Sequence, residues 1–187
     1  LKTEKARQIH NDLQSSLATI KELFNSLLDI SKPEAGVMQP KMEDFRVQQL
    51  FDRLEIVFRQ QAIENNLDLR IVASRYTLYS DPHLLQQALV NLVSNAIKYT
   101  SESAVFIGCR RKNRHVRLLV WDTGPGIPRH KQSDVFKEFI QLSNPQRDRS
   151  KGLGLGLSIF KRTCKLLEHP VRFSSVRGVG TRFEIVV

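Results

Sequence analysis

The chain has 187 residues, a length that fits one full domain with a short additional element and excludes two large domains. Its 41% hydrophobic and 26% charged residues are close to the average of soluble globular proteins, which excludes a disordered or collagen-like chain. The two cysteines, Cys109 and Cys164, are far apart and belong to no Cys/His cluster. The sequence therefore indicates neither a disulfide framework nor a zinc site, and a reducing, cytoplasmic environment is expected.

The net charge of +10 is unevenly distributed. Residues 1–100 contain 12 basic and 12 acidic residues, whereas residues 101–187 contain 17 basic and 7 acidic ones. Such an excess suits nucleic acid, an acidic membrane surface, an acidic protein or a phosphate-bearing ligand. Because no apolar run approaches a membrane span and the chain begins without Met or a signal pattern, we expect a cytoplasmic fragment, with an inner-membrane anchor as an option for the full-length protein.

The first segment, residues 6–31, is predicted to form one long helix. Its apolar residues follow a heptad spacing at Leu13, Leu17, Ile20, Phe24 and Leu27. Such a seam needs a partner, most economically a second copy of itself. Pro33 and Gly36 are expected to end the helix.

The remaining sequence alternates between strand and helix patterns. The expected strands cover residues 42–47, 67–72, 77–79, 105–110, 116–122, 171–175 and 181–187. The expected helices cover 48–65, 81–99 and 155–167, and a short helix around 135–139 is expected within the long loop 124–154. This order predicts an α/β layer with mixed strand connections.

Three short segments carry residues suited to chemistry, and the first lies near the end of a predicted helix. Asn91, Asn95 and Lys98 are spaced by four and three, so they share one helical face. Two amides and an ammonium suit a hydrated Mg²⁺ with attached phosphates. A solvated helix face is the alternative.

The second segment joins the end of a predicted strand to a turn. Asp122 is followed by Gly124, Pro125 and Gly126. A carboxylate at a strand end can accept a hydrogen bond from an exocyclic amine such as that of adenine, and the glycines allow the backbone to approach a flat ring. A plain turn is the alternative.

The third segment, residues 152–159, is a glycine-rich loop that enters a helix. Backbone N–H groups and the helix dipole at such a position favour phosphate. The segment lacks the ending of a P-loop, and no strand leads directly into it as in a Rossmann fingerprint. A mobile hinge is the alternative.

Taken together, the segments resemble the ATP-binding domain of bacterial sensor histidine kinases, within the superfamily that includes DNA gyrase, mismatch-repair and heat-shock chaperone ATPases. Residues 91–100 look like the asparagine box, 122–127 the first glycine box and 152–159 the second. Residues 136–139 fit the phenylalanine motif, and 178–183 fit the terminal glycine turn. Residues 27–36 resemble the end of the second dimerisation helix.

The resemblance implies a Bergerat-type α+β sandwich, with a mixed sheet packed on one side by helices and preceded by one long N-terminal helix. Residues 1–36 would be the second helix of an incomplete dimerisation hairpin, and 37–187 the catalytic ATP-binding domain. Asn95 would be the Mg²⁺ ligand with Asn91 beside it, Lys98 would contact phosphate, and residues 128–150 would form a flexible lid. The implied ATP-binding residues are Asn91, Asn95, Lys98, Tyr99, Asp122, Gly124, Gly126, Ile127, Phe139, Gly152, Leu153, Gly154, Leu155, Gly156 and Thr181.

The resemblance also implies the reaction and the partners. An ATP-dependent protein-histidine kinase transfers the γ-phosphate to a histidine on the first dimerisation helix of a homodimer, for relay to an aspartate of a response regulator receiver domain. His10 lacks the adjacent acid and the nearby proline of that histidine motif, so we interpret it as a seam residue of the second helix. The fragment is therefore expected to bind ATP and Mg²⁺ without phosphorylating itself efficiently.

Three other classes of protein compete with this interpretation. A gyrase-type ATPase needs a glutamate base, and the segment from Asp81 to Thr100 contains no Glu. A degenerate nucleotide-binding scaffold of the same fold would be distinguished by its nucleotide affinity. A nucleic-acid-binding protein is not predicted, because Trp121, Phe136 and Phe139 fall in the ATP boxes.

The basic residues of 110–114 are expected to keep the surface solvated, with binding of an acidic regulator as the alternative.

Overall fold

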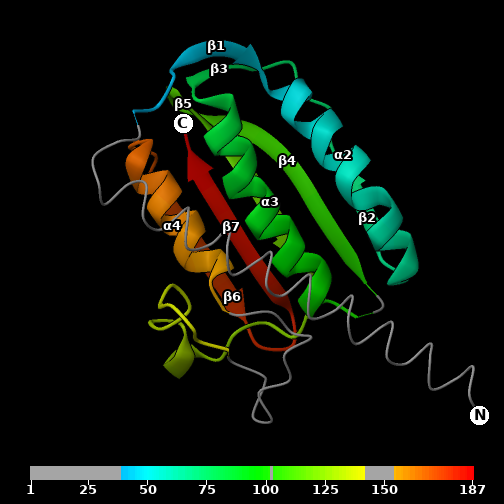
Figure 1. Ribbon diagram of the computed structural model, residues 1–187. Helices are drawn as coiled ribbons and strands as arrows, with labels where there is room; N and C mark the ends of the chain where they lie inside the picture. The colour runs from blue at the N-terminus through cyan, green and yellow to red at the C-terminus, as the bar shows by residue number, and fades with distance from the viewer. Residues whose placement is uncertain (1–38, 102, 142–153) are drawn as a thin grey trace, which may run out of the picture.

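The computed structural model describes residues 39–101, 103–141 and 154–187 (Figure 1). The expected long N-terminal helix, the proposed dimerisation segment 1–36 and His10 lie outside the described residues. Two of the expected nucleotide contacts, Gly152 and Leu153, also lie outside them.

Seven strands and three α-helices make up the described residues. The strands are β1 (Glu43–Arg46), β2 (Asp68–Ile71), β3 (Thr77–Ser80), β4 (Ala104–Lys112), β5 (His115–Asp122), β6 (Val171–Val176) and β7 (Gly180–Val186). The helices are α2 (Val47–Glu64), α3 (Pro82–Tyr99) and α4 (Gly156–Leu166), with a 3₁₀ turn at η1 (Arg129–Lys131). These bounds lie close to the predicted ranges.

The main sheet has five strands in the order β2-β4-β5-β7-β6. β2 runs parallel to β4, and the other neighbours are antiparallel. The helices α2, α3 and α4 lie on one side of this sheet, and β1 pairs with β3 in a separate antiparallel ribbon (Figure 1). The prediction of a mixed sheet packed on one side by helices is confirmed; the separate ribbon was not anticipated.

The core lies between the helices and one face of the sheet. Side chains alternate along each strand, so β4 and β5 bury Val105, Ile107, Leu118 and Val120 toward the helices. The central helix α3 buries eight residues at helical spacing: Leu84, Leu85, Ala88, Leu89, Leu92, Val93, Ala96 and Ile97. This packing fixes the rotation of α3, and with it the direction of the polar residues between the apolar ones.

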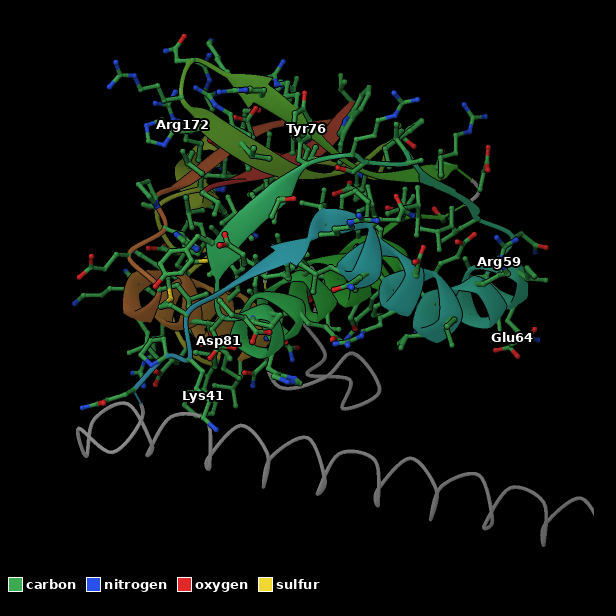
Figure 2. All side chains as sticks on the ribbon, turned by 90° about the horizontal axis from the view of Figure 1, so that it is seen from above. Lys41, Arg59, Glu64, Tyr76, Asp81 and Arg172 are labelled. Atoms are coloured by element: carbon green, nitrogen blue, oxygen red, sulfur yellow. The ribbon has the colours of Figure 1, made fainter. Side chains whose placement is uncertain are left out.

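The N-terminus of α3 is held by Asp81. Its Oδ1 accepts the backbone N–H groups of His83 at 2.9 Å and Leu84 at 3.0 Å. Its Oδ2 accepts the backbone N–H of Lys41 at 2.8 Å, which ties the start of the described chain to the helix (Figure 2). A single buried carboxylate therefore caps the helix and anchors the incoming segment.

The expected short helix around residues 135–139 is wrong. The structure instead has η1 at Arg129–Lys131, followed by turns. The Gln132 side chain donates to the carbonyls of Ile127 and Ser175 at 2.8 and 3.0 Å, which holds this segment against β6. Phe139 has a φ of +60°, a left-handed conformation that a helix cannot contain.

We predict that Asp81→Ala lowers the free energy of unfolding by about 1 to 2 kcal/mol, because the cap of α3 and the contact to Lys41 are lost together. Urea denaturation measures this change. Asp52→Ala is the matched control, since this exposed carboxylate accepts a hydrogen bond from the Gln48 side chain of its own helix. Equal stability of the two variants would contradict the assigned role of Asp81.

Candidate functional site

An open pocket lies between the C-terminal half of α3, the ends of β5 and β7, and the first turn of α4. It encloses about 960 Å³ between the surrounding atoms, including the solvent at its mouth. Its lining is largely apolar, with polar groups at Asn95, Asp122, Gln141 and Thr181. A concave apolar site with a few polar groups is typical of a small-molecule site.

Asp122 is the acidic group of this pocket. It ends β5, pairs in register with Thr181 of β7 and is half-buried. Its Oδ1 accepts the backbone N–H of Gly124 at 3.0 Å. Burial raises the pKa of the Asp122 carboxyl, and backbone hydrogen bonds from Gly124 and Thr181 partly oppose that rise. The carboxylate keeps further acceptor capacity for a donor inside the pocket.

The turn after Asp122 is shaped by Gly126. Its φ is +66°, and a Cβ atom at this position would lie 2.1 Å from the carbonyl oxygen of Val176. Ile127 then donates its backbone N–H to Ser175 Oγ at 2.7 Å. The glycine thus allows the pocket wall to pack directly on the end of β6.

The asparagine box of α3 and the second glycine box, at the start of α4, meet where these two helices pack together. A Cβ atom on Gly156 would lie 3.1 Å from Asn95 Nδ2 and 3.6 Å from Asn91 Oδ1. The absence of a side chain at the start of α4 therefore leaves room beside both amides. The N-terminus of α4 has no side-chain cap, and the first N–H groups of a helix have no intrahelical partners.

Lys98 and Tyr99 lie at the end of α3 beside the pocket. Tyr99 lines it and is 41% exposed. The Lys98 ammonium lies 5.5 Å from the centre of the Tyr99 ring, a cation–π contact. Lys98 itself is exposed and does not line the pocket.

The structure brings eight of the predicted ATP-binding residues together in the pocket lining. They are Asn95, Tyr99, Asp122, Gly126, Ile127, Gly154, Gly156 and Thr181. Asn91 and Gly124 are not part of the lining but lie next to Gly156 and Asp122, which are. Leu155 is buried in the core at 2% exposure. Phe139 is 64% exposed and lies outside the lining. The role of each residue in binding stays a prediction.

Sequence reasoning missed the apolar part of the lining. It did not assign to the pocket Leu92, Ala96, Val120, Pro125, Pro128, Val135, Ile140, Leu157 and Phe183, nor the polar Gln141. Several of these positions follow the same apolar periodicity as the core, so the pattern could not separate a pocket wall from packed interior. The one signal for these residues was their position next to a box residue: Leu92 and Ala96, for example, flank Asn95.

Comparison with known proteins is consistent with this geometry. The family model described as Histidine kinase-, DNA gyrase B-, and HSP90-like ATPase matches residues 80–187. The circadian input-output histidine kinase CikA of Synechococcus elongatus is 31% identical over 188 residues, covering 98% of this chain and 25% of that protein. The adaptive-response sensory kinase SasA of Crocosphaera subtropica is 30% identical over 185 residues, covering 96% and 48% respectively.

Solved structures show the same fold. Full-length ShkA in complex with AMPPNP superposes with a TM-score of 0.82 at 23% identity, covering 97% of this chain and 38% of that one. Histidine kinase ThkA in complex with the response regulator protein TrrA has a TM-score of 0.69 at 21% identity, covering 90% and 48%.

The chain belongs to the family of histidine kinase-, DNA gyrase B- and HSP90-like ATPases. The resemblance inferred from the three boxes is thereby confirmed, as is the Bergerat-type fold. The chain spans 25% to 36% of the length of the first three curated relatives. Among the described residues, no helix is both long and apolar enough to cross a membrane.

We predict that Gly126→Ala lowers the free energy of unfolding by about 3 kcal/mol, because left-handed strain is combined with a clash against Val176. Thermal or urea denaturation measures the loss. Gly178→Ala is the matched control: its φ is +78°, but nothing lies within 4 Å of its Cβ position, so only about 1 kcal/mol is expected from strain alone. Similar losses in both variants would refute the close packing of the 124–127 turn.

Proposed function

We propose that this chain is the catalytic ATP-binding domain of a sensor histidine kinase. It binds ATP in the pocket and transfers the γ-phosphate to a histidine on a dimerisation helix, for relay to a response regulator aspartate. One observation supports this most strongly: three features line the same largely apolar pocket. They are the half-buried Asp122 carboxylate, the Asn95 amide and the start of α4, which no side chain caps.

The Asp122 end of the pocket suits adenine. The carboxylate accepts a hydrogen bond from the exocyclic amine, while the apolar walls from Leu92, Val120 and Ile127 enclose the flat ring. Tyr99 offers an aromatic face at the mouth for the adenine or the ribose. Burial makes the single polar contact selective, because an adenine analogue without the amine leaves the Asp122 carboxylate without that partner.

The α4 end of the pocket suits the phosphates. The first backbone N–H groups of α4 and the positive end of its dipole favour negative charge, and no side chain caps them. Lys98, at the end of α3, is long and exposed enough to approach this charge. Both groups support triphosphate binding at Gly154–Gly156.

The amides of α3 fit a hard divalent cation. Asn95 faces the pocket, and the space over Gly156 lies next to both Asn95 and Asn91. Amide oxygens are hard ligands, so we propose Asn95 as the protein ligand of Mg²⁺, with Asn91 positioning it. When bound, Mg²⁺ neutralises phosphate charge during transfer.

Transfer to another protein is favoured over hydrolysis. The helix α3 contains no glutamate that could serve as a base for water. Phosphoryl transfer needs chiefly positioning and charge stabilisation, and the incoming imidazole is itself the nucleophile. ShkA was solved with AMPPNP and ThkA with a response regulator, which supports the same ligand and partner here. We further propose that the full-length protein is a homodimer. A scaffold without transfer activity is the alternative.

We predict that Asp122→Asn weakens ATP binding by about tenfold or more, because the hydrogen bond to a charged acceptor is lost. Isothermal titration calorimetry measures the affinity. Asp44→Asn removes an exposed acid of β1 outside the pocket and should leave the affinity unchanged. An Asp122 variant that stays folded and binds ATP as well as the unaltered chain would remove Asp122 from the adenine site.

The reaction is tested by supplying the histidine in trans. With γ-labelled ATP and Mg²⁺, the chain is expected to label the separate dimerisation hairpin of a relative such as SasA. Asn95→Ala should abolish this labelling and the gain in ATP affinity on adding Mg²⁺, while the affinity measured in EDTA stays the same.

Two results would count against the proposal. Tight ATP binding without labelling of any histidine-bearing hairpin would favour the scaffold. An Asn95→Ala variant that keeps its Mg²⁺-dependent gain in affinity would remove Asn95 as the ligand.

A further inference from the structure

The face of the five-stranded sheet opposite the helices forms a distinct surface. Within residues 39–101, 103–141 and 154–187, all three α-helices lie on the other side, and Arg172 marks this open side in Figure 2. We call it the open sheet face. Its residues are Val72, which directly follows β2, and the following outward residues of the strands: Arg70, Phe106, Gly108, Arg110, Arg117, Leu119, Trp121, Arg172, Arg182 and Glu184.

One row of this face places two aromatic rings between two cationic groups across four strands. Arg70, Phe106, Trp121 and Arg182 are register partners in that order. The Arg70 Cζ lies 5.3 Å from the Phe106 ring centre, and the Phe106 and Trp121 rings stack at 5.1 Å. Trp121 remains 41% exposed. Trp121 was predicted to belong to the ATP boxes, but it lies on the side of the sheet opposite Asp122.

Beside this row, three arginines converge on one carboxylate. Glu184 Oε1 accepts a hydrogen bond from Arg110 at 3.1 Å, and Oε2 accepts one from Arg117 at 2.9 Å. Arg182 forms an ion pair with Oε1 at 3.2 Å. Burial opposes ionisation of Glu184, but the Arg117 hydrogen bond and the charges of Arg182 and Arg110 outweigh it and lower the pKa of the carboxyl. The site therefore keeps one negative and three positive charges.

The positive excess leaves hydrogen-bond donors in place. Three guanidinium groups share a single carboxylate, and the buried Arg117 Nε has no acceptor among the described residues. Arg110 and Arg182 keep about half of their side-chain surface exposed, 51% and 45%. Arg172, the exposed register partner of Glu184, adds a fourth cation. Fixed, partly exposed guanidinium groups favour carboxylate ligands.

An apolar strip runs between the cationic groups. Gly108 and Leu119 are register partners on β4 and β5. Val72 lies beside Gly108: a Cβ atom added to Gly108 would lie 3.5 Å from the Cβ of Val72. Val72 is 61% exposed. An apolar side chain of a ligand can pack here next to the aromatic pair, while its acidic neighbours meet the arginines.

We propose that the open sheet face binds an acidic protein segment that carries apolar side chains between its carboxylates. Charge complementarity supplies the attraction, and the apolar strip together with the Phe106 and Trp121 rings supplies apolar contact. A single-stranded nucleic acid would need free ring faces for base stacking, and Phe106 already has Arg70 and Trp121 as ring contacts. The surface lies across the sheet from the nucleotide pocket, so both ligands fit at once.

Trp121 provides the test, because it is the only tryptophan of the chain. The nucleotide-free protein is titrated with a short synthetic peptide of glutamates and interspersed leucines, and Trp121 fluorescence is recorded. We expect a saturable change that weakens with salt. The double variant Arg110→Gln with Arg182→Gln should bind the peptide about tenfold more weakly, since two charged contacts are lost.

The matched control removes two cations from the helix side, Arg59→Gln with Lys165→Gln, and should bind the peptide like the unaltered chain. ATP affinity should be the same in both double variants. The proposal is overturned if the acidic peptide gives no saturable change, if a lysine-for-glutamate peptide binds equally well, or if both double variants lose affinity alike. Tighter binding of an oligothymidine than of the acidic peptide would assign the face to nucleic acid instead.

Discussion

The packing of α3 on the inner face of β4 and β5 is the constraint on which the rest of the molecule depends. Eight buried side chains fix the rotation of this helix, and Asp81 fixes where it begins. Asn91 and Asn95 lie between those buried positions, so their direction toward α4 follows from the packing of the core. The same contact brings Gly156 against both amides, although it is more than sixty residues away in the chain.

Much of this arrangement was predictable from the sequence. The apolar period of α3 predicted a helix, and the proline after Asp81 predicted where that helix begins. The alternation in β4 and β5 predicted two strands. Asp122 and Asn95 were identified from the order of the three boxes and their resemblance to the ATP-binding domain of histidine kinases, since each box alone had a plain structural alternative. The segment around Phe139 was mispredicted because tertiary hydrogen bonds through Gln132 outweighed its helical pattern. The apolar pocket wall had no signal of its own.

Alternation along β5 also separates the pocket from the open sheet face. Asp122 points to the helix side, where burial raises the pKa of its carboxyl, whereas Trp121 points to the open sheet face. Sequence proximity suggested that both residues served the ATP boxes. Because neighbouring residues of a strand point to opposite faces, Trp121 and Asp122 cannot belong to the same site. This alternation alone would have placed Trp121 on the open sheet face.

The central claim is that ATP occupies the pocket between α3, the ends of β5 and β7, and the start of α4. The most direct measurement is a ¹H–¹⁵N NMR titration of the chain with ATP and Mg²⁺. We expect large chemical-shift changes for the backbone amides of Gly124, Gly156 and Thr181, with little change at Gly108 and Arg172 on the open sheet face. Shifts confined to the open sheet face, or none at saturating ATP, would contradict it.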